Sequence, residues 1–146
     1  DKDKKQKNIA EKSIKDLKIL LAEDNELNME IAEFILQNEG ASVTKAWNGQ
    51  EAVEIFKKSR PDEVDVILMD IMMPVMNGYE AAKMIRTLDR DDAKTVPIIA
   101  MTANAFTEDR LRSKESGMNE HIAKPINAKV LVKVISELME NKEEDS

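Results

Sequence analysis

The sequence predicts an α/β fold in which helices cover a parallel β-sheet. Short apolar runs alternate along the chain with longer segments of helical period, and five such pairs can be counted. The run at 64–69 is almost continuously apolar, which is typical of a central parallel strand because helices cover both of its faces. The length of 146 residues and the hydrophobic content of 42% suit one domain with a single sizeable core.

The expected strands are short runs rich in aliphatic and β-branched residues. The third is the most apolar of the five, and the fifth is the shortest and carries the weakest pattern. The predicted strands are Leu17–Ala22, Ser42–Ala46, Val64–Met69, Pro97–Met101 and Asn119–Ile122.

A helix is expected after each strand. In the first, Leu27, Ile31, Phe34 and Ile35 recur at helical spacing and predict an apolar stripe against the sheet, and Gly40 ends the helix. The others are expected around Ala52, Val53 and Phe56 after Asn48-Gly49, at about Tyr79–Leu88, at about Thr107–Ser116, and around Val130, Leu131, Val134, Ile135 and Leu138.

The helix near Thr107–Ser116 differs from the others in its thin apolar stripe, essentially Phe106 and Leu111. A thinly apolar helix is anchored weakly, so we expect the segment 105–117 to shift at low cost. At the two ends of the chain, residues 1–16 and 141–146 are mostly polar or charged. We therefore predict a linker over 1–16, a folded domain over 17–140 and a flexible acidic tail over 141–146.

The composition excludes several classes of function. Lys and Arg number 22 against 29 Asp and Glu, and the net charge of −7 repels a phosphate backbone, so direct nucleic-acid binding is not expected. With no Cys and one His, the chain offers no thiolate nucleophile and no cysteine or histidine-rich zinc site. No apolar run approaches the ~20 residues that span a bilayer, so we expect a cytoplasmic segment without membrane contact.

Polar side chains follow four of the five expected strands. Glu23 and Asp24 follow the first strand, Asp70 ends the third, Thr102 ends the fourth and Lys124 follows the fifth. Because the carboxyl ends of parallel strands share one edge, where α/β sheets bind their ligands, these groups are expected to converge.

Three carboxylates in one pocket repel each other unless a divalent cation neutralises them, and an all-oxygen ligand set suits hydrated Mg²⁺. Magnesium leaves coordination positions for phosphate oxygens, so the cluster indicates phosphoryl chemistry. Asp70 is the candidate nucleophile, and the Thr102 hydroxyl and the Lys124 ammonium are suited to contact phosphoryl oxygens.

Four pieces of the sequence, in order and each at a strand end, resemble the receiver domains of two-component response regulators, over about residues 17–140. They are Leu20-Leu21-Ala22-Glu23-Asp24-Asn25, Met69-Asp70-Ile71-Met72-Met73-Pro74 through Gly78, Met101-Thr102-Ala103 and Lys124-Pro125.

The resemblance implies a flavodoxin-like doubly wound (βα)5 fold with a five-stranded parallel sheet in the order 2-1-3-4-5. It implies that Asp70 accepts a phosphoryl group from a phosphohistidine, with Glu23, Asp24, Asp70 and the backbone carbonyl of Met72 around Mg²⁺. Thr102 and Lys124 would contact the phosphoryl group, and the Lys124-Pro125 bond would be cis. The family's domains promote their own phosphorylation and dephosphorylation but are not turnover enzymes alone.

The segments Glu23-Asp24-Asn25 with Leu27-Asn28 and Asn48-Gly49-Gln50-Glu51-Ala52 resemble receivers fused to hybrid histidine kinases more than stand-alone receivers. The expected partners are then the kinase's own phosphohistidine domain and a histidine phosphotransfer protein. For a stand-alone receiver they are a separate sensor kinase and an effector. The signal sensed and the oligomeric state are left open by the sequence.

Two other classes of function stay open at this point. A receiver-like docking module that acts without phosphorylation would bind Mg²⁺ weakly, and the intact acidic set argues against it. An aspartyl phosphatase or a flavin protein is disfavoured, because Asp70-Ile71-Met72 lacks a second acid two residues on and the acidic first loop would repel a flavin phosphate.

Single residues also carry alternative interpretations. His121 stands where the family usually has a switching Tyr or Phe; we expect a partly buried strand residue, with a switch role as the second hypothesis and a metal ligand role disfavoured. Trp47 is expected to be a packing or surface residue outside the pocket. The methionines near the site, Met69, Met72, Met73, Met76 and Met101, are interpreted as core fillers and not as a soft-metal site.

Overall fold

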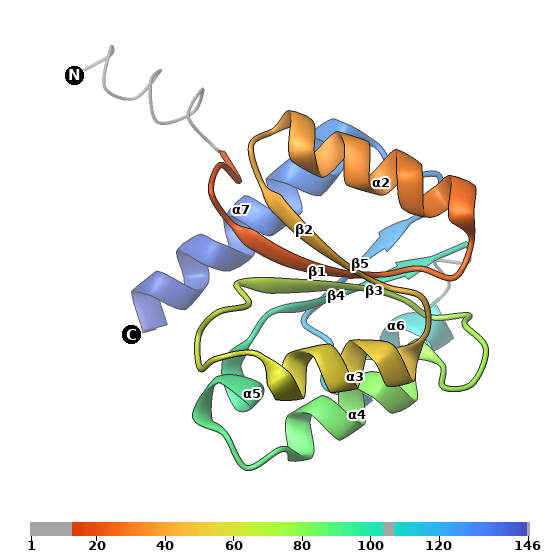
Figure 1. The fold of residues 1–146 in the computed structure, drawn as a ribbon, viewed down its shortest axis with the longest axis vertical. Coiled ribbons are helices and arrows are strands. Elements are labelled where there is room, and N and C mark those ends of the chain that lie inside the picture. Colours follow the sequence, from red (N-terminus) through yellow and green to blue (C-terminus); the bar gives the residue numbers. More distant parts are fainter. Residues whose placement is uncertain (1–12, 104–106, 146) are drawn as a thin grey trace.

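The computed structural model describes residues 13–103 and 107–145, which build one five-stranded sheet (Figure 1). All strand pairs are parallel and the order is β2-β1-β3-β4-β5, as the resemblance implied. The strands are β1 (Lys18–Ala22), β2 (Ser42–Ala46), β3 (Val66–Asp70), β4 (Ile98–Thr102) and β5 (Glu120–Ala123). The helices are α2 (Glu26–Asn38), α3 (Gly49–Lys58), α4 (Gly78–Thr87), α5 (Asp91–Thr95), α6 (Thr107–Glu115) and α7 (Ala128–Asp145).

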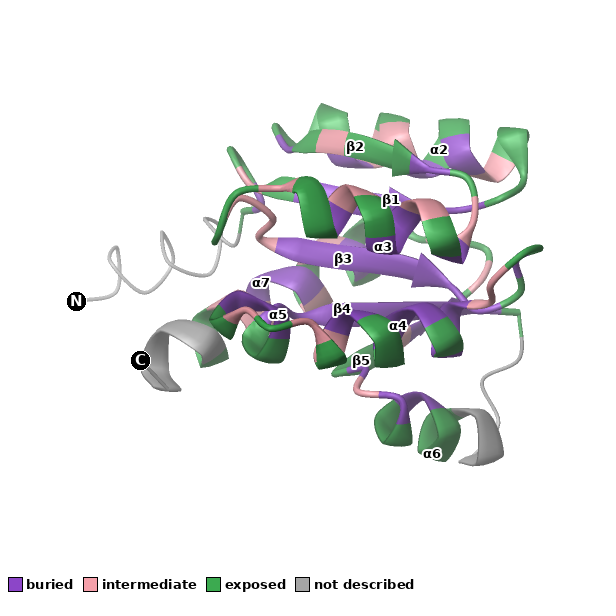
Figure 2. Ribbon diagram, turned by 60° about the horizontal axis from the view of Figure 1, so that its bottom comes forward, coloured by how far each residue is buried: buried purple, intermediate pink, exposed green. Residues whose placement is uncertain are grey.

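Alternate residues of the strands face two separate apolar layers. Leu20, Ile67 and Ile98 point to the layer that contains α3, α4 and α5, while Leu21, Leu68 and Ile99 point to the layer that contains α2 and α7. This alternation follows from the period of two in a strand, and it explains why β3 and β4 are buried along their whole length (Figure 2).

The strand ends lie slightly further along the chain than the apolar runs indicated. The third strand was expected at Val64–Met69, but its pairing with β1 begins at Val66 and its pairing with β4 continues to Asp70. Thr102 likewise pairs with Ala123 as the last residue of β4. Both polar residues are therefore held by sheet hydrogen bonding and not by a loop.

The predicted apolar stripe of α2 is wrong for three of its four residues, while the fourth, Ile35, is partly buried against the core. Leu27 is 63% exposed and Phe34 is 70% exposed, and Ile31 also faces solvent. The buried side is instead made by Met29, Ala32 and Leu36, which lie about opposite on a helix that turns ~100° per residue. The helix is apolar on two sides, so its period alone could not decide which side meets the sheet.

Other elements also depart from the sequence-based picture. The short helix α5 was not predicted, because its residues, Asp91 to Thr95, carry no apolar period. Residues 141–146 were predicted to be a flexible acidic tail, and in the structure α7 extends to Asp145, since Lys and Glu are good helix formers. In the predicted linker, Ile14 is fully buried in the α2 and α7 layer, so packing begins before residue 17.

The helix α6 has a thin apolar stripe, as expected from its composition. Leu111 is 59% exposed, and Phe106, the other member of the predicted stripe, lies outside the described residues. At the C-terminal end of α6, the guanidinium of Arg86 in α4 donates to the carbonyl oxygen of Gly117 from Nε at 3.0 Å and from Nη2 at 2.8 Å. Within α6 itself, the guanidinium carbon of Arg112 lies 4.3 Å from the centre of the Tyr79 ring in α4, and Ser113 is buried. The contacts of α6 are therefore mainly polar and lie toward its C-terminal half.

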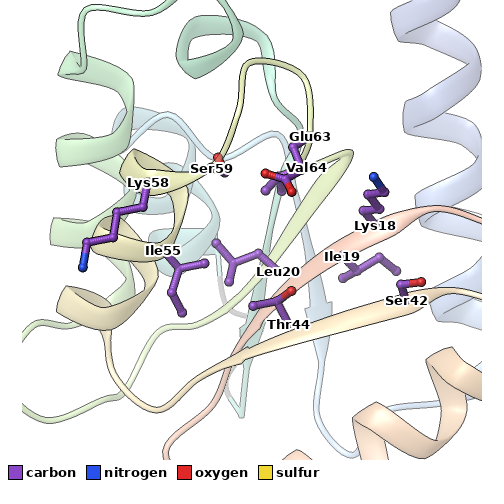
Figure 3. A pocket seen from close by; sticks show the side chains of 10 residues that line it. All are labelled: Lys18, Ile19, Leu20, Ser42, Thr44, Ile55, Lys58, Ser59, Glu63 and Val64. Carbon is purple, nitrogen blue, oxygen red and sulfur yellow. The ribbon is translucent and has the colours of Figure 1, made fainter.

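At one corner of the sheet, a cavity takes the place of a covering helix among the described residues. A cavity of about 320 Å³ lies over the amino-terminal halves of β1 and β2, beside the C-terminal end of α3 (Figure 3). Ser42 and Thr44 line it, where a covered strand would carry apolar residues. Within 13–103 and 107–145, none of the helices has the length and apolar content to cross a membrane.

Candidate functional site

The turn after β1 carries two acids in different environments. Glu23 is 1% exposed, its amide donates to the carbonyl of Ala46, and its Oε1 accepts from the amide of Asn25 at 3.1 Å. Asp24 is exposed. Asn25 caps α2 by accepting from the amide of Asn28 at 2.9 Å. The cap starts the helix directly after the acids and so holds them at the strand end.

Asp70 is the last residue of β3 and is 4% exposed. The amide of Met72 lies 3.4 Å from its Oδ1. The backbone of Asp70 also packs closely against Gly78, the first residue of α4. A Cβ at Gly78 would collide with the carbonyl oxygen of Asp70. In the sequence, Gly78 stands out only as the end of a motif. The signal of its packing role is that it opens a helix, where no left-handed turn requires a glycine.

The structure brings the three predicted acids together. Glu23, Asp24 and Asp70 each offer a carboxylate oxygen, and these oxygens all lie within 4.8 Å of one another. They come from the carboxyl ends of adjacent strands β1 and β3, at the point where the strand order reverses. Carboxylate oxygens at this spacing fit a hard divalent cation, and a Mg²⁺-sized ion matches the set better than one that prefers sulfur or nitrogen.

Lys124, the residue after β5, completes the cluster. Its Nζ lies 2.9 Å from Oε2 of Glu23 and 3.1 Å from Oδ2 of Asp70. The Lys124 amide donates to the carbonyl of Thr102, and the Lys124-Pro125 peptide bond is cis, as the resemblance implied. One ammonium therefore serves two buried carboxylates.

The charges of this cluster do not balance, and the pKa of Asp70 shows the result. Burial raises the pKa of Asp70, and the neighbouring Glu23 raises it further; the bond to Lys124 only partly offsets these effects, and the pKa reaches about 6. Burial lowers the pKa of Lys124, but its bonds to Glu23 and Asp70 outweigh burial, so the pKa of the ammonium is raised. A second positive charge would relieve the repulsion, which supports the fit of a cation to these residues.

The remaining predicted residues differ in their burial. Thr102 is 7% exposed at the end of β4, and Met72 is in the loop after Asp70 with its side chain 78% exposed. The expectation that Met72 fills the core is therefore wrong, whereas Met69 and Met101 are fully buried. His121 is a half-buried residue of β5, as expected, with Nδ1 3.6 Å from Oε1 of Glu120. Trp47 is 37% exposed.

Comparison with known proteins is consistent across sequence and structure. Residues 19–136 match the response regulator receiver domain family. The chain is 38% identical over 121 residues to hybrid signal transduction histidine kinase I of Dictyostelium discoideum, and the match covers 82% of the chain but 7% of that protein. The chain thus spans only a small part of the length of this relative.

Two solved structures show the same fold. The receiver domain of the sensor histidine kinase PA1611 of Pseudomonas aeruginosa, with a magnesium ion coordinated in its active site cleft, is 37% identical, with a TM-score of 0.77 over 86% of this chain and 98% of that one. The receiver domain of Ssk1 of Saccharomyces cerevisiae, in complex with the histidine phosphotransfer protein Ypd1, is 33% identical, with a TM-score of 0.75 over 85% and 89% of the two chains.

Proposed function

The chain belongs to the response regulator receiver domain family, and from this premise we propose that Asp70 accepts a phosphoryl group from the phosphohistidine of a partner protein. The observation that carries the proposal is the charge imbalance at the carboxyl end of the sheet. Two buried carboxylates share one ammonium, and the pKa of Asp70 is raised to about 6. A site with this excess of negative charge is stabilised by a bound cation, and the same positive charge would then neutralise the oxygens of an incoming phosphoryl group.

In the proposed transfer, an Oδ of Asp70 attacks phosphorus in line with the leaving nitrogen. A new O–P bond forms as the P–N bond of the phosphohistidine breaks, and the electron pair stays on the imidazole nitrogen. The phosphoryl oxygens then lie within reach of two groups of this chain. Lys124 Nζ already contacts Asp70 at 3.1 Å, and Thr102 ends the adjacent strand.

The carboxylates of Glu23, Asp24 and Asp70, with the backbone carbonyl of Met72, would hold Mg²⁺. When bound, the ion supplies positive charge that neutralises the carboxylates and the phosphoryl oxygens. The chain's own residues hold the ligands and the nucleophile in position. Glu23 is held by Lys124 and by the Asn25 amide, so the side chain keeps one orientation, and the pairing of Asp70 with β4 fixes the height of the nucleophile.

Phosphorylation at Asp70 would change the surface far from it through α6. Added phosphoryl oxygens compete for Lys124 and draw the Thr102 hydroxyl inward, and the chain that follows Thr102 leads into α6. Because Arg86 fixes the C-terminal end of α6 at Gly117, movement of the Thr102 end would turn the helix about that point. His121 lies on β5 beside α6, and we propose it as the residue whose position follows this movement.

The exposed side of α2 is the proposed docking face for the phosphodonor. The exposed side chains of this face are Leu27, Ile31 and Phe34. Ile31 also lines a small cavity with Lys124 and Pro125, next to the acidic cluster. An apolar strip of this kind beside a reaction site is suited to an amphipathic helix of a partner. The complex of the Ssk1 receiver with a histidine phosphotransfer protein supports a partner of this class.

We propose that the parent protein is a hybrid sensor histidine kinase. The match to hybrid signal transduction histidine kinase I over 7% of its length supports this context. The polar-differentiation response regulator DivK of Brucella anthropi, 91% of which is covered by the match, supports the stand-alone alternative. In both settings the phosphodonor is a cytoplasmic protein, and a chain without cysteine suits that compartment.

Phosphorylation is tested by incubating the chain with Mg²⁺ and a small phosphodonor such as acetyl phosphate, followed by intact mass. One added phosphoryl group is expected, and none in Asp70→Asn. The matched control is Asp92→Asn, a buried acid remote from the cluster, which should label normally. Label that persists in Asp70→Asn overturns the assignment, and a wild-type chain without label but with its docking intact is a docking module.

The docking face is tested with Phe34→Ser. We expect slower phosphotransfer from a histidine phosphotransfer protein and an unchanged rate from acetyl phosphate, because only the protein donor uses the face. Leu111→Ser on α6 is the matched control, since Leu111 is similarly exposed at 59%. Equal loss with both donors would show that Phe34 acts on the site itself and not on docking.

A further inference from the structure

The loop between β3 and α4 is attached to the second βα turn through one glycine. The amide of Gly49, the first residue of α3, donates to the carbonyl oxygen of Met76 at 3.0 Å. The first amides of a helix have no partner within the helix, so this donor is available for a loop outside it. Here the loop that it reaches is the one that follows Asp70.

The contact leaves no room for a side chain at residue 49. Gly49 is buried, and a Cβ there would collide with the Met76 carbonyl oxygen and lie 2.9 Å from the Met76 carbonyl carbon and 3.0 Å from the Asn77 carbonyl oxygen. All three are backbone atoms, which cannot rotate away as the end of a side chain can. The φ angle of Gly49 is not in the left-handed region, so the glycine is required for its size and not for its conformation.

The same loop is fixed at its other points. The amide of Ile71 donates to Met101 in β4 at 3.2 Å, and the amide of Gly78 donates to Ile71 at 2.9 Å. Between these ends, Val75 adopts a φ of 67°, which is rare for a β-branched residue and persists only where the surroundings hold it. The bond from Gly49 falls one residue after Val75 and is the described contact that holds this part of the loop from the side of α3.

We propose that Gly49 is a positioning residue for the metal site. By holding Met76 close to the start of α3, it sets the height of the loop over residues 72–77, and with it the backbone carbonyl of Met72 beside Asp70. This inference rests on the proposed Mg²⁺ site. Residues that orient metal ligands without touching the metal affect its affinity by ~10–100-fold when changed.

The test is Mg²⁺ binding to the unphosphorylated chain, measured by titration calorimetry, for wild type and Gly49→Ala. We expect the Kd for Mg²⁺ to rise by about tenfold or more in Gly49→Ala. The phosphorylation rate with acetyl phosphate should fall at limiting Mg²⁺ and recover at saturating Mg²⁺. If Gly49→Ala only displaces the Met72 carbonyl, saturating Mg²⁺ restores the phosphorylation rate. If the substitution instead damages the Asp70 nucleophile, saturating Mg²⁺ does not restore it.

The matched control is Asn48→Ala. Its side chain caps α3 by accepting from the amide of Glu51 at 2.8 Å, so its loss destabilises the same helix without pressing on the loop. We expect its Kd for Mg²⁺ to stay within about twofold of wild type. An equal weakening in Asn48→Ala would mean that Gly49 acts through helix stability, which would overturn the inference.

Two further outcomes separate this inference from the proposed function. A wild-type chain that binds no Mg²⁺ contradicts the proposed site, whereas wild-type affinity in a folded Gly49→Ala contradicts only the role of Gly49. If Gly49→Ala shows no cooperative unfolding transition, replacing the residue 49 amide by an ester deletes the donor and adds no atom. The inference then requires weaker Mg²⁺ binding in the ester, and unchanged binding overturns it.

Discussion

Two buried charge clusters in this molecule use the same kinds of groups to opposite effect. At the carboxyl end of the sheet, Glu23 and Asp70 share Lys124, and the pKa of Asp70 is raised to about 6. On the α3 and α5 side, Nη2 of Arg90 lies 2.7 Å from Oδ2 of Asp92, and no second carboxylate is described as sharing this guanidinium. The hydrogen bond from Arg90 holds the pKa of Asp92 below its ordinary value.

The difference lies in how many partners each charge has. The Arg90 guanidinium also donates to the carbonyls of Phe56, Ser59 and Arg60 at the end of α3 and lies 4.8 Å from the centre of the Phe56 ring. Asp92 in turn accepts from the amide of Asp62 at 3.0 Å. Every charge is satisfied, so the Arg90 cluster stabilises the fold. The Asp70 cluster is left with excess negative charge, which makes it responsive to ligands.

The largest effect is expected from removing Arg90. In Arg90→Met, Asp92 loses the counter-ion that it has among residues 13–103 and 107–145, and α3 loses its carbonyl contacts. The free energy of unfolding should therefore fall by about 3 kcal/mol. Urea denaturation measures this, with exposed Lys58→Met as the control expected within about 0.5 kcal/mol of wild type. Labelling of Asp70 should persist under folding conditions. A loss below about 1 kcal/mol would remove the contrast between the clusters.

Because the pKa of Asp70 is raised, the free energy of unfolding should fall as the pH rises. The pKa of Asp70 is about 6 when folded and 3.8 ordinarily, so between these values the folded chain holds a proton that the unfolded chain has released. Raising the pH through this window therefore favours unfolding, by about 2 kcal/mol in the metal-free protein. The measurement is urea denaturation with EDTA at pH 4.5 and pH 7, taken as the difference from Asp70→Asn.

The Asp92 carboxyl should contribute in the opposite direction. Its pKa is lowered in the folded chain, so its stabilisation is present above the ordinary pKa and is lost only as the pH falls through the folded value, below about 4. A wild-type chain whose stability, relative to Asp70→Asn, rises between pH 4.5 and 7 would contradict the raised pKa of Asp70.

Neutralising one acid in each cluster should change stability in opposite directions. At neutral pH without metal, Asp70→Asn removes the repulsion with Glu23 and should raise the free energy of unfolding by about 1 to 2 kcal/mol. Asp92→Asn removes the charge that faces Arg90 and should lower it by a similar amount, about 1 to 2 kcal/mol. Thermal and urea unfolding of the two variants side by side measure this, and changes of the same sign would break the comparison.

The smallest effect is the response to magnesium. At ten times its Kd, Mg²⁺ should raise the free energy of unfolding of the wild type by about 1.4 kcal/mol, because it binds the folded chain. Asp92→Asn should gain the same amount, and Asp70→Asn should gain much less, since it lacks one of the three carboxylates. Thermal unfolding with Mg²⁺ and with EDTA separates these outcomes.

The polar residues at the strand ends were predictable because the sheet decides their position. Once the five apolar runs are known, parallel pairing takes Asp70, Thr102 and Lys124 to one edge, and they lie there in the structure. The apolar period was sufficient for the existence of the helices but not for the orientation of α2, where Phe34 and Leu36 lie on opposite sides of the helix and Leu36 is the buried one.

The Arg90 cluster and Gly49 could not be found in the same way. Arg90 acts through backbone carbonyls of residues more than 30 positions away, and no residue pattern announces such contacts. Gly49 matters because of the atoms opposite it, which are known only when α3 and the loop after Asp70 are placed together. Local pattern predicts which face of a strand is apolar, while contacts between loops depend on the assembled molecule.

The bond between Lys124 and Glu23 joins residues that are 101 positions apart in the chain. During synthesis, β1 and β3 leave the ribosome with the three acids before Lys124 has been added to the chain. Until β5 takes its place at the edge of the sheet, the carboxylates have no lysine to orient them. A chain that ends before β5 therefore holds the carboxylates of Glu23 and Asp70 without their contacts to Lys124.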